Sequence, residues 1–171
     1  TFPPGPWLLE GELMKENDIP KEIDLLLLTQ GLADHAHIPT LKLLNKNIPV
    51  IGSESAVKVA ENLGFQSTNV IKPGDEIHQN DLLIQATAGA SVPQIENGYI
   101  LSHKSGSLYI EPHGFLDQRI DSQNIDAVIT PIIDIGLNFG VKFIQGRTIL
   151  PKLIKKFKPS TILASTTGGD I

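Results

Sequence analysis

The 171-residue chain contains no cysteine. No disulfide can form, and any metal site must be built from histidine, aspartate, glutamate or water, because no thiolate is available. The 14 lysines and arginines are outnumbered by 19 acidic residues, and no basic cluster exceeds the short Lys152–Lys158 region. The net charge of −5 therefore gives no support for nucleic-acid binding. No apolar run approaches the ~18 residues of a membrane span, and no signal peptide is visible. We expect a cytoplasmic protein with no nucleic-acid or membrane partner.

What the chain does contain is typical of a globular protein. Its hydrophobic content is 40% and its charged content 19%. The length suits one domain with a substantial core, and we expect residues 1–171 to form that single domain. The chain starts at Thr1, and Thr161–Ala164 reads as a strand that would normally feed another element. We therefore expect the domain to be partial.

One stretch organises the rest of the chain. Leu25–Leu28 is a run of four leucines, which predicts a strand buried on both faces within a layered α/β sheet. Asp34, His35 and His37 follow shortly after it. Ligands and catalytic groups gather at the carboxyl ends of such strands, so these side chains are candidates for a site. Another interpretation is that Asp34 caps the helix that Pro39 begins, while His35 bonds a neighbouring loop.

The remaining pattern is α/β, then hairpin-rich, then α/β again. The expected strands, taken in order, are Ile48–Gly52, Thr68–Ile71, Glu76–His78, Leu82–Ala88, Gly98–Lys104, Ser107–Glu111, Asp126–Pro131 and Thr161–Ala164. Helices are expected at Trp7–Glu16, from Pro39 to Asn45, from Ser53 or Ser55 to Leu63, and at Gly146–Phe157 with Pro151 inside.

The frame Thr-x-x-x-x-Asp-His after an aliphatic strand resembles the Thr-His-x-His-x-Asp-His signature of the metallo-β-lactamase superfamily, in its lactonase-like, metal-dependent hydrolase branch. Thr29, Asp34 and His35 fall in register with it. The first two histidine positions hold Gln30 and Leu32, so the metal-binding motif is degenerate. The family's opening hairpins have no match before Leu25. The resemblance implies an α/β (α+β) fold, a four-layer αββα sandwich that lacks its N-terminal hairpins in this chain.

A second segment also resembles the family. Ser107–Gly114 is similar to its strand-to-loop segment, but no aspartate occupies the loop. Glu111 and His113 are there instead, and both can ligate a metal. A surface-turn role for His113 is the alternative. Other family ligand positions hold small residues, at Ala86–Ser91 and at Ala164–Gly169, and we expect His78 and His103 to be exposed.

The resemblance implies a divergent hydrolase that uses metal-activated water. Its substrate would be a small molecule, namely an ester, lactone or phosphoester. It would bind one divalent ion, zinc by preference, through Asp34, His35, His113 and Glu111, with Asp34 also catalytic. The alternative is a metal-free pseudoenzyme or small-molecule-binding protein whose pocket is rebuilt from Gln30 and Ser165–Thr167. Association into a homo-oligomer stays open.

Overall fold

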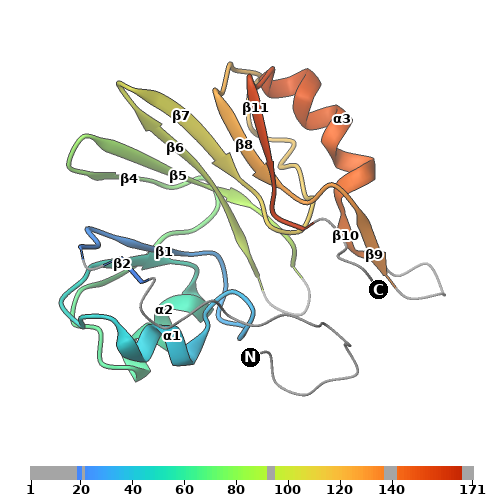
Figure 1. The fold of residues 1–171 in the computed structure, drawn as a ribbon. Coiled ribbons are helices and arrows are strands. Elements are labelled where there is room, and N and C mark those ends of the chain that lie inside the picture. The colour runs from blue at the N-terminus through green and yellow to red at the C-terminus, as the bar shows by residue number, and fades with distance from the viewer. Residues whose placement is uncertain (1–18, 21, 92–94, 137–141, 167–171) are drawn as a thin grey trace.

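The first half of the computed structural model is a small parallel sheet covered by helices (Figure 1). The structure describes residues 19–20, 22–91, 95–136 and 142–166. Strands and helices alternate here as β1 (Leu26–Leu28), α1 (Ile38–Leu43), β2 (Val50–Gly52), α2 (Glu54–Asn62) and β3 (Thr68–Val70). The three strands pair in parallel in the order β1-β2-β3. The predicted β-α-β-α rhythm is confirmed.

The second half builds a larger mixed sheet. Its elements are β4 (Glu76–Gln79), β5 (Leu82–Ala88), β6 (Asn97–His103), β7 (Gly106–Ile110), β8 (Ala127–Thr130), β9 (Asp134–Gly136), β10 (Lys142–Gln145), α3 (Gly146–Phe157) and β11 (Thr161–Ala164). Six strands pair in the order β11-β8-β7-β6-β5-β4, antiparallel from β4 to β7 and parallel from β7 to β11. Strands β9 and β10 form a separate antiparallel pair.

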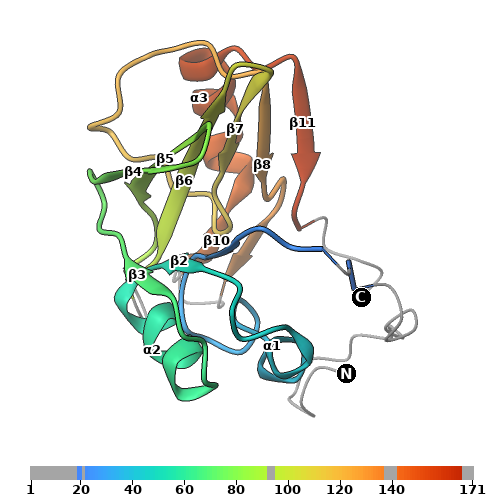
Figure 2. The same cartoon turned by 90° about the vertical axis from the view of Figure 1, so that its left-hand side faces the viewer.

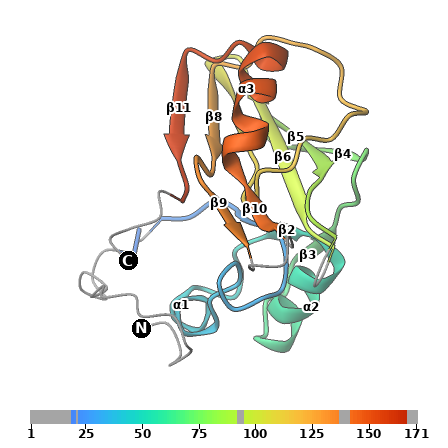
Figure 3. The same cartoon turned by 90° about the vertical axis from the view of Figure 1, so that its right-hand side faces the viewer.

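Three apolar clusters show that the layers are helix, sheet, sheet and helix. The first packs α1 and α2 on the small sheet, through residues such as Leu41, Ala56 and Val50. The second packs α3 on the large sheet, through residues such as Leu153 and Val128. The third lies between the two sheets and joins Ile51, Ile71, Ile84, Ala86 and Tyr99. Figures 2 and 3 show α3 on one outer side and α1 and α2 beneath the small sheet. The predicted αββα arrangement is confirmed.

The hydroxyl of Tyr99 ties the two sheets together. It donates to the Leu28 carbonyl oxygen at 2.8 Å, and it accepts from Asn97 Nδ2 at 3.2 Å. Asn97 Nδ2 also donates to the carbonyl oxygen of Ile71 at 2.8 Å. The carboxyl end of β1 and the start of β6 are therefore held against each other, and both carry candidate site residues.

Some local predictions were wrong. The burial of β1 is less complete than predicted, because the strand lies at the edge of its sheet in the described part of the chain and only Leu28 is buried. Both faces are covered as predicted, since Leu26 packs against the cluster on the helix side and Leu27 against the cluster between the sheets. Asp34 does not cap α1, whose N-cap is His37. The short strands β9 and β10 were not predicted. The helix expected at Trp7–Glu16 lies outside the described residues. No helix in the described ranges is long and apolar enough to cross a membrane.

Candidate metal centre

His35 lies in the loop that leaves β1. Its Nδ1 is 2.9 Å from the hydroxyl oxygen of Thr29, the first residue after the strand. The His35 amide donates to the Leu32 carbonyl oxygen at 2.9 Å, which closes a turn. Gly31 lets this loop pass close to α2, because a Cβ at that position would lie 2.5 Å from the Ser55 carbonyl oxygen. The loop is thus fixed at both ends, with the His35 ring turned inward.

His113 enters from the loop after β7. The Glu111 amide donates to the Ile129 carbonyl oxygen at 2.9 Å, which extends the β7–β8 pairing by one residue. The His113 amide then donates to Glu111 Oε1 at 3.2 Å, and its carbonyl oxygen accepts from the Gln145 amide at 3.0 Å. These bonds hold the backbone on both sides of the His113 ring, whose side chain is 19% exposed.

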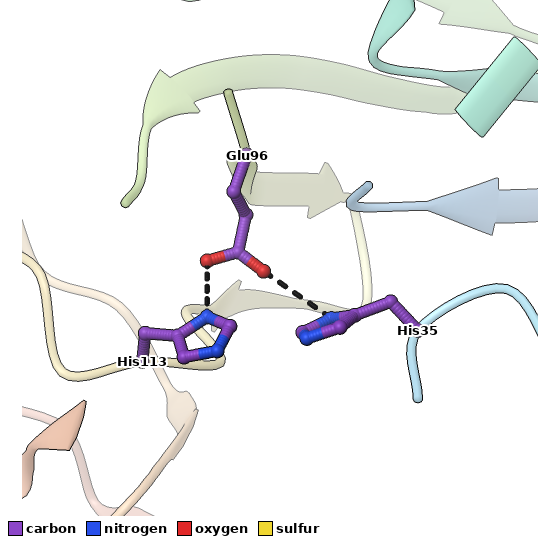
Figure 4. Close-up of side chains that lie close together, drawn as sticks. All are labelled: His35, Glu96 and His113. Atoms are coloured by element: carbon purple, nitrogen blue, oxygen red, sulfur yellow. Dashed lines mark hydrogen bonds and ion pairs between the residues drawn. The ribbon is translucent and has the colours of Figure 1, made fainter. Parts of the chain in front are cut away.

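Glu96 joins the two histidines from the start of β6 (Figure 4). Its side chain is fully buried. Glu96 Oε2 lies 2.5 Å from His113 Nδ1, and Oε1 lies 3.2 Å from His35 Nδ1. The two imidazole rings stack with their centroids 4.9 Å apart and an angle of 28° between their planes. One ligand atom from each of these three residues lies within 4.8 Å of the other two.

A fourth side chain completes the surroundings of the carboxylate. Gln30 is 1% exposed, and its Nε2 donates to Glu96 Oε1 at 3.3 Å. Its amide oxygen Oε1 has no partner in the described part of the chain. Gln30 therefore belongs to the site, although it occupies a position where the family motif has a histidine.

The pKa values of the two histidines are shifted in opposite directions. Burial lowers the pKa of His35, and the nearby carboxylates of Glu96 and Asp34 do not compensate. Burial also acts to lower the pKa of His113, but the hydrogen bond and charge of Glu96 outweigh it, so this pKa is raised. Glu96 therefore favours the protonated form of the His113 ring more than that of the His35 ring.

The other predicted site residues lie around this cluster. Asp34 is at the solvent side, with a side chain 59% exposed and Oδ2 at 3.5 Å from His35 Nε2. Glu111 is completely buried behind His113, and burial raises its pKa to about 8. His37 instead contacts Thr40, while His78 is exposed and His103 half-buried. The Ser165 amide donates to the Thr130 carbonyl oxygen in β8, and the Thr166 carbonyl oxygen accepts from the Ile132 amide in the loop after β8. Thr167 lies outside the described residues.

Glu96 was not among the site residues expected from the sequence. It follows a proline-containing segment and is 61 positions from His35, so no local spacing connects the two. The available signal was a single carboxylate placed directly before the apolar strand that begins at Asn97. A charged residue there has to be exposed, paired or bound to a metal.

The residues present fit one metal ion. Two imidazoles and one carboxylate are a donor set that catalytic zinc sites use, with a further position left to water or substrate. The orphaned buried oxygen of Gln30 adds a weak, hard donor beside the same carboxylate. The structure brings together His35 and His113 as predicted. Metal-ligand roles for His35, His113, Asp34 and Glu111 all stay predictions.

Comparison with known proteins gives the family. A protein-family model described as the beta-lactamase superfamily domain matches residues 6–165. No curated protein matches the chain by sequence. Among solved structures, the isothiocyanate hydrolase from Delia radicum gut bacteria aligns with a TM-score of 0.67 and 19% identity, over 85% of this chain and 62% of that one. A possible metal-dependent hydrolase from Veillonella parvula gives 0.65 and 16%, over 83% and 61%.

A third neighbour is CmlA, a diiron beta-hydroxylase from Streptomyces venezuelae. It gives a TM-score of 0.67 at 15% identity, over 88% of this chain and 37% of that one. This chain spans less than two thirds of each of these three proteins. At such identities the likeness to solved structures shows the fold alone. Together with the match to the family model, which covers nearly all of the sequence, it establishes that the chain belongs to the metallo-β-lactamase superfamily.

Proposed function

We propose that this protein is a divergent metal-dependent hydrolase, acting on an ester, lactone or phosphoester. The observation that carries the proposal is the convergence of His35, Glu96 and His113 from three separate segments. Strand ends of two sheets meet there, and Asp34 borders the cluster on the solvent side. Burying the Glu96 carboxylate costs free energy unless the group is paired or binds a metal. This cost supports a functional role for the three side chains.

The metal would be held by His35, Glu96 and His113. When bound, an ion such as zinc polarises a carbonyl or phosphoryl oxygen and makes water nucleophilic near neutral pH. Replacement of the motif histidines by Gln30 and Leu32 supports at most one ion, since leucine has no lone pair and an amide oxygen is a poor zinc ligand.

The chain's own residues supply positioning and a base. Gln30 holds Glu96 Oε1 through its amide group, and Thr29 contacts His35 Nδ1, so the carboxylate and the ring keep their orientation. Asp34 is solvent-exposed and adjacent to His35 Nε2. It is placed to take a proton from water or return one to a leaving group, as a general base and acid.

A metal-free binding protein is the second candidate, and one observation favours it. Both oxygens of Glu96 already have partners within the chain, since Glu96 contacts His113, His35 and Gln30. A hydrogen bond between a buried carboxylate and an imidazole whose pKa is raised is stabilising in itself.

Elemental analysis of the protein, purified without added metal, tests the proposal. We expect no more than one divalent ion per chain. Calorimetric titration with zinc should show one site that His35→Ala abolishes, whereas the matched variant His78→Ala should leave it unchanged. Two tight zinc ions per chain would contradict the one-ion account, and no binding at all would favour the metal-free protein.

A further inference from the structure

A small pocket adjoins the candidate metal centre on the side of His113. It has a volume of ≈ 180 Å³ and lies between the loop that follows β7, strand β10 and the segment after β5. His113 borders the pocket, which therefore shares one side chain with the cluster of His35, Glu96 and His113. A group bound in the pocket would lie beside a proposed metal ligand.

Two walls of the pocket are held together by the backbone. Gly114 has a φ of +69°, and a Cβ at this position would lie 2.6 Å from the carbonyl carbon of Gln145. Glycine therefore lets the loop after β7 run directly against β10. The Gln145 amide also donates to the His113 carbonyl oxygen at 3.0 Å. A pocket fixed in this way loses little conformational freedom when a ligand binds.

Two exposed phenylalanines border this pocket. Phe115 belongs to the loop after β7 and is 39% exposed, and Phe143 belongs to β10 and is 43% exposed. Single exposed apolar residues are normal on a protein surface. Two aromatic side chains that come from separate segments and border one hollow are a different matter, because each supplies a large apolar contact area. They indicate a binding surface for an apolar group.

The volume of the pocket limits what it can hold. A cavity of about 150 Å³ is large enough for benzene. The pocket, at ≈ 180 Å³, therefore accommodates one aromatic ring or a short branched alkyl chain. Pockets that enclose a whole ligand measure about 300–1,000 Å³. The pocket thus suits one substituent of a substrate whose remaining part lies outside it.

Charge around the pocket favours a neutral substrate. Lys142 is the only lysine or arginine that borders the pocket in the described part of the chain. Its Nζ lies 2.8 Å from Asp134 Oδ2, and this pairing lowers the pKa of the Asp134 carboxyl. The neighbouring cluster adds the carboxylates of Glu96 and Asp34. A phosphoester would bring further negative charge to these groups, whereas a carboxylic ester or a lactone brings none.

We infer that this pocket receives the apolar substituent, such as a benzyl group, of a neutral ester or lactone that is hydrolysed at the metal centre. The inference rests on the proposed function and narrows its substrate class to carboxylic esters and lactones. Phe115 and Phe143 would contact the substituent, and the carbonyl group would lie toward His113. The oxygen of water bonds to the carbonyl carbon, and the bond from that carbon to the alcohol oxygen breaks as a proton of the water passes to that oxygen. An ester gives an acid and an alcohol, and a lactone gives a hydroxy acid.

The first test is an NMR titration of the full 171-residue chain, labelled with ¹⁵N and purified without metal. The probe is N-benzylacetamide, an amide analogue of a benzyl ester, and N-methylacetamide is the matched probe without the ring. We expect saturable shifts at the amides of Gly114, Phe115 and Phe143 with the first probe only. Phe143→Ala should weaken binding about three- to tenfold, as expected for the loss of one aromatic contact. Benzyl phosphate should bind more weakly than N-benzylacetamide.

Kinetics of the zinc-loaded protein test the substrate class. The ratio of kcat/KM for benzyl acetate to kcat/KM for methyl acetate should fall about three- to tenfold in Phe143→Ala. The matched control is Leu43→Ala, which removes an exposed apolar side chain from α1. It should change neither this ratio nor the binding of N-benzylacetamide.

Several results would overturn the inference. They are shifts that do not saturate, equal binding of the two amides, tighter binding of benzyl phosphate, and equal effects of Phe143→Ala and Leu43→Ala. If zinc binds but N-benzylacetamide does not, the inference about the pocket fails alone. If N-benzylacetamide binds but zinc does not, the proposed hydrolysis fails, and the pocket belongs to the metal-free binding protein.

Discussion

Glu111 makes a specific prediction about stability and pH. The carboxyl is completely buried, one of its oxygens accepts the His113 amide, and the other has no partner in the described part of the chain. Burial raises its pKa to about 8 from an ordinary value of 4.5. The folded protein therefore holds a proton on Glu111 at neutral pH, whereas the unfolded chain has released it.

The sign follows from proton counting. Between pH 4.5 and about 8 the folded state binds one more proton than the unfolded state, so the free energy of unfolding falls as the pH rises. Each pH unit in that window is worth about 1.4 kcal/mol. This group alone should therefore cost about 4 kcal/mol between pH 5 and pH 8, to order of magnitude. Glu111→Gln is neutral at every pH and keeps an oxygen for the His113 amide.

Urea unfolding of the wild type and Glu111→Gln at several pH values from 5 to 8 measures the difference. We expect the variant to gain on the wild type steadily as the pH rises. The matched control is Glu76→Gln, which removes an exposed carboxyl on β4 and should run parallel to the wild type. Parallel curves for Glu111→Gln would refute the reasoning, because they would mean that the buried carboxyl does not carry the proton.

Three further predictions concern other parts of the molecule. Tyr99→Phe removes the hydroxyl that joins Leu28 and Asn97, and should lower the free energy of unfolding by about 1–2 kcal/mol in urea; an unchanged midpoint would contradict this. Gly146→Ala would place a Cβ 2.6 Å from the Ile133 carbonyl oxygen, so unfolding measurements should show a loss of about 2–3 kcal/mol, and wild-type stability would be the contrary result. Glu96 raises the pKa of His113, so zinc has to compete with a proton on that ring. Calorimetry in buffers of different ionisation enthalpy should therefore show proton release, with affinity rising from pH 5 to 7; no dependence on buffer would count against His113 as a ligand.

Local pattern was enough to predict much of the fold. The hairpin around Ser105, the helix Gly146–Phe157 and the strand Thr161–Ala164 are confirmed, because turn residues and apolar periodicity act over a few positions. The leucine run is packed on both faces, as predicted, but only Leu28 of β1 is buried. How deeply a strand is buried depends on whether it lies inside a sheet or at its edge, and sheet order is a long-range property.

The site was predictable only in part, for the same reason. His35 and His113 each follow a strand, and strand ends are favoured places for ligands. Glu96 comes from the start of a strand, and only the packing of the two sheets through Tyr99 brings it to His35. The burial of Glu111 likewise could not be read from a Glu-Pro-His segment that resembles a surface turn.

Gln30 and Glu96 make physical sense as a pair. A fully buried carboxylate requires hydrogen-bond donors or a cation, and Gln30, His35 and His113 surround it on both oxygens. A proton on His113 can balance its charge, and so can a divalent ion that replaces that proton. The two candidate functions therefore differ in what neutralises Glu96 and need no different arrangement of side chains. Glu96→Gln removes the charge that either one balances, so it should abolish zinc binding in a hydrolase and return the His113 pKa toward its ordinary value in a metal-free protein.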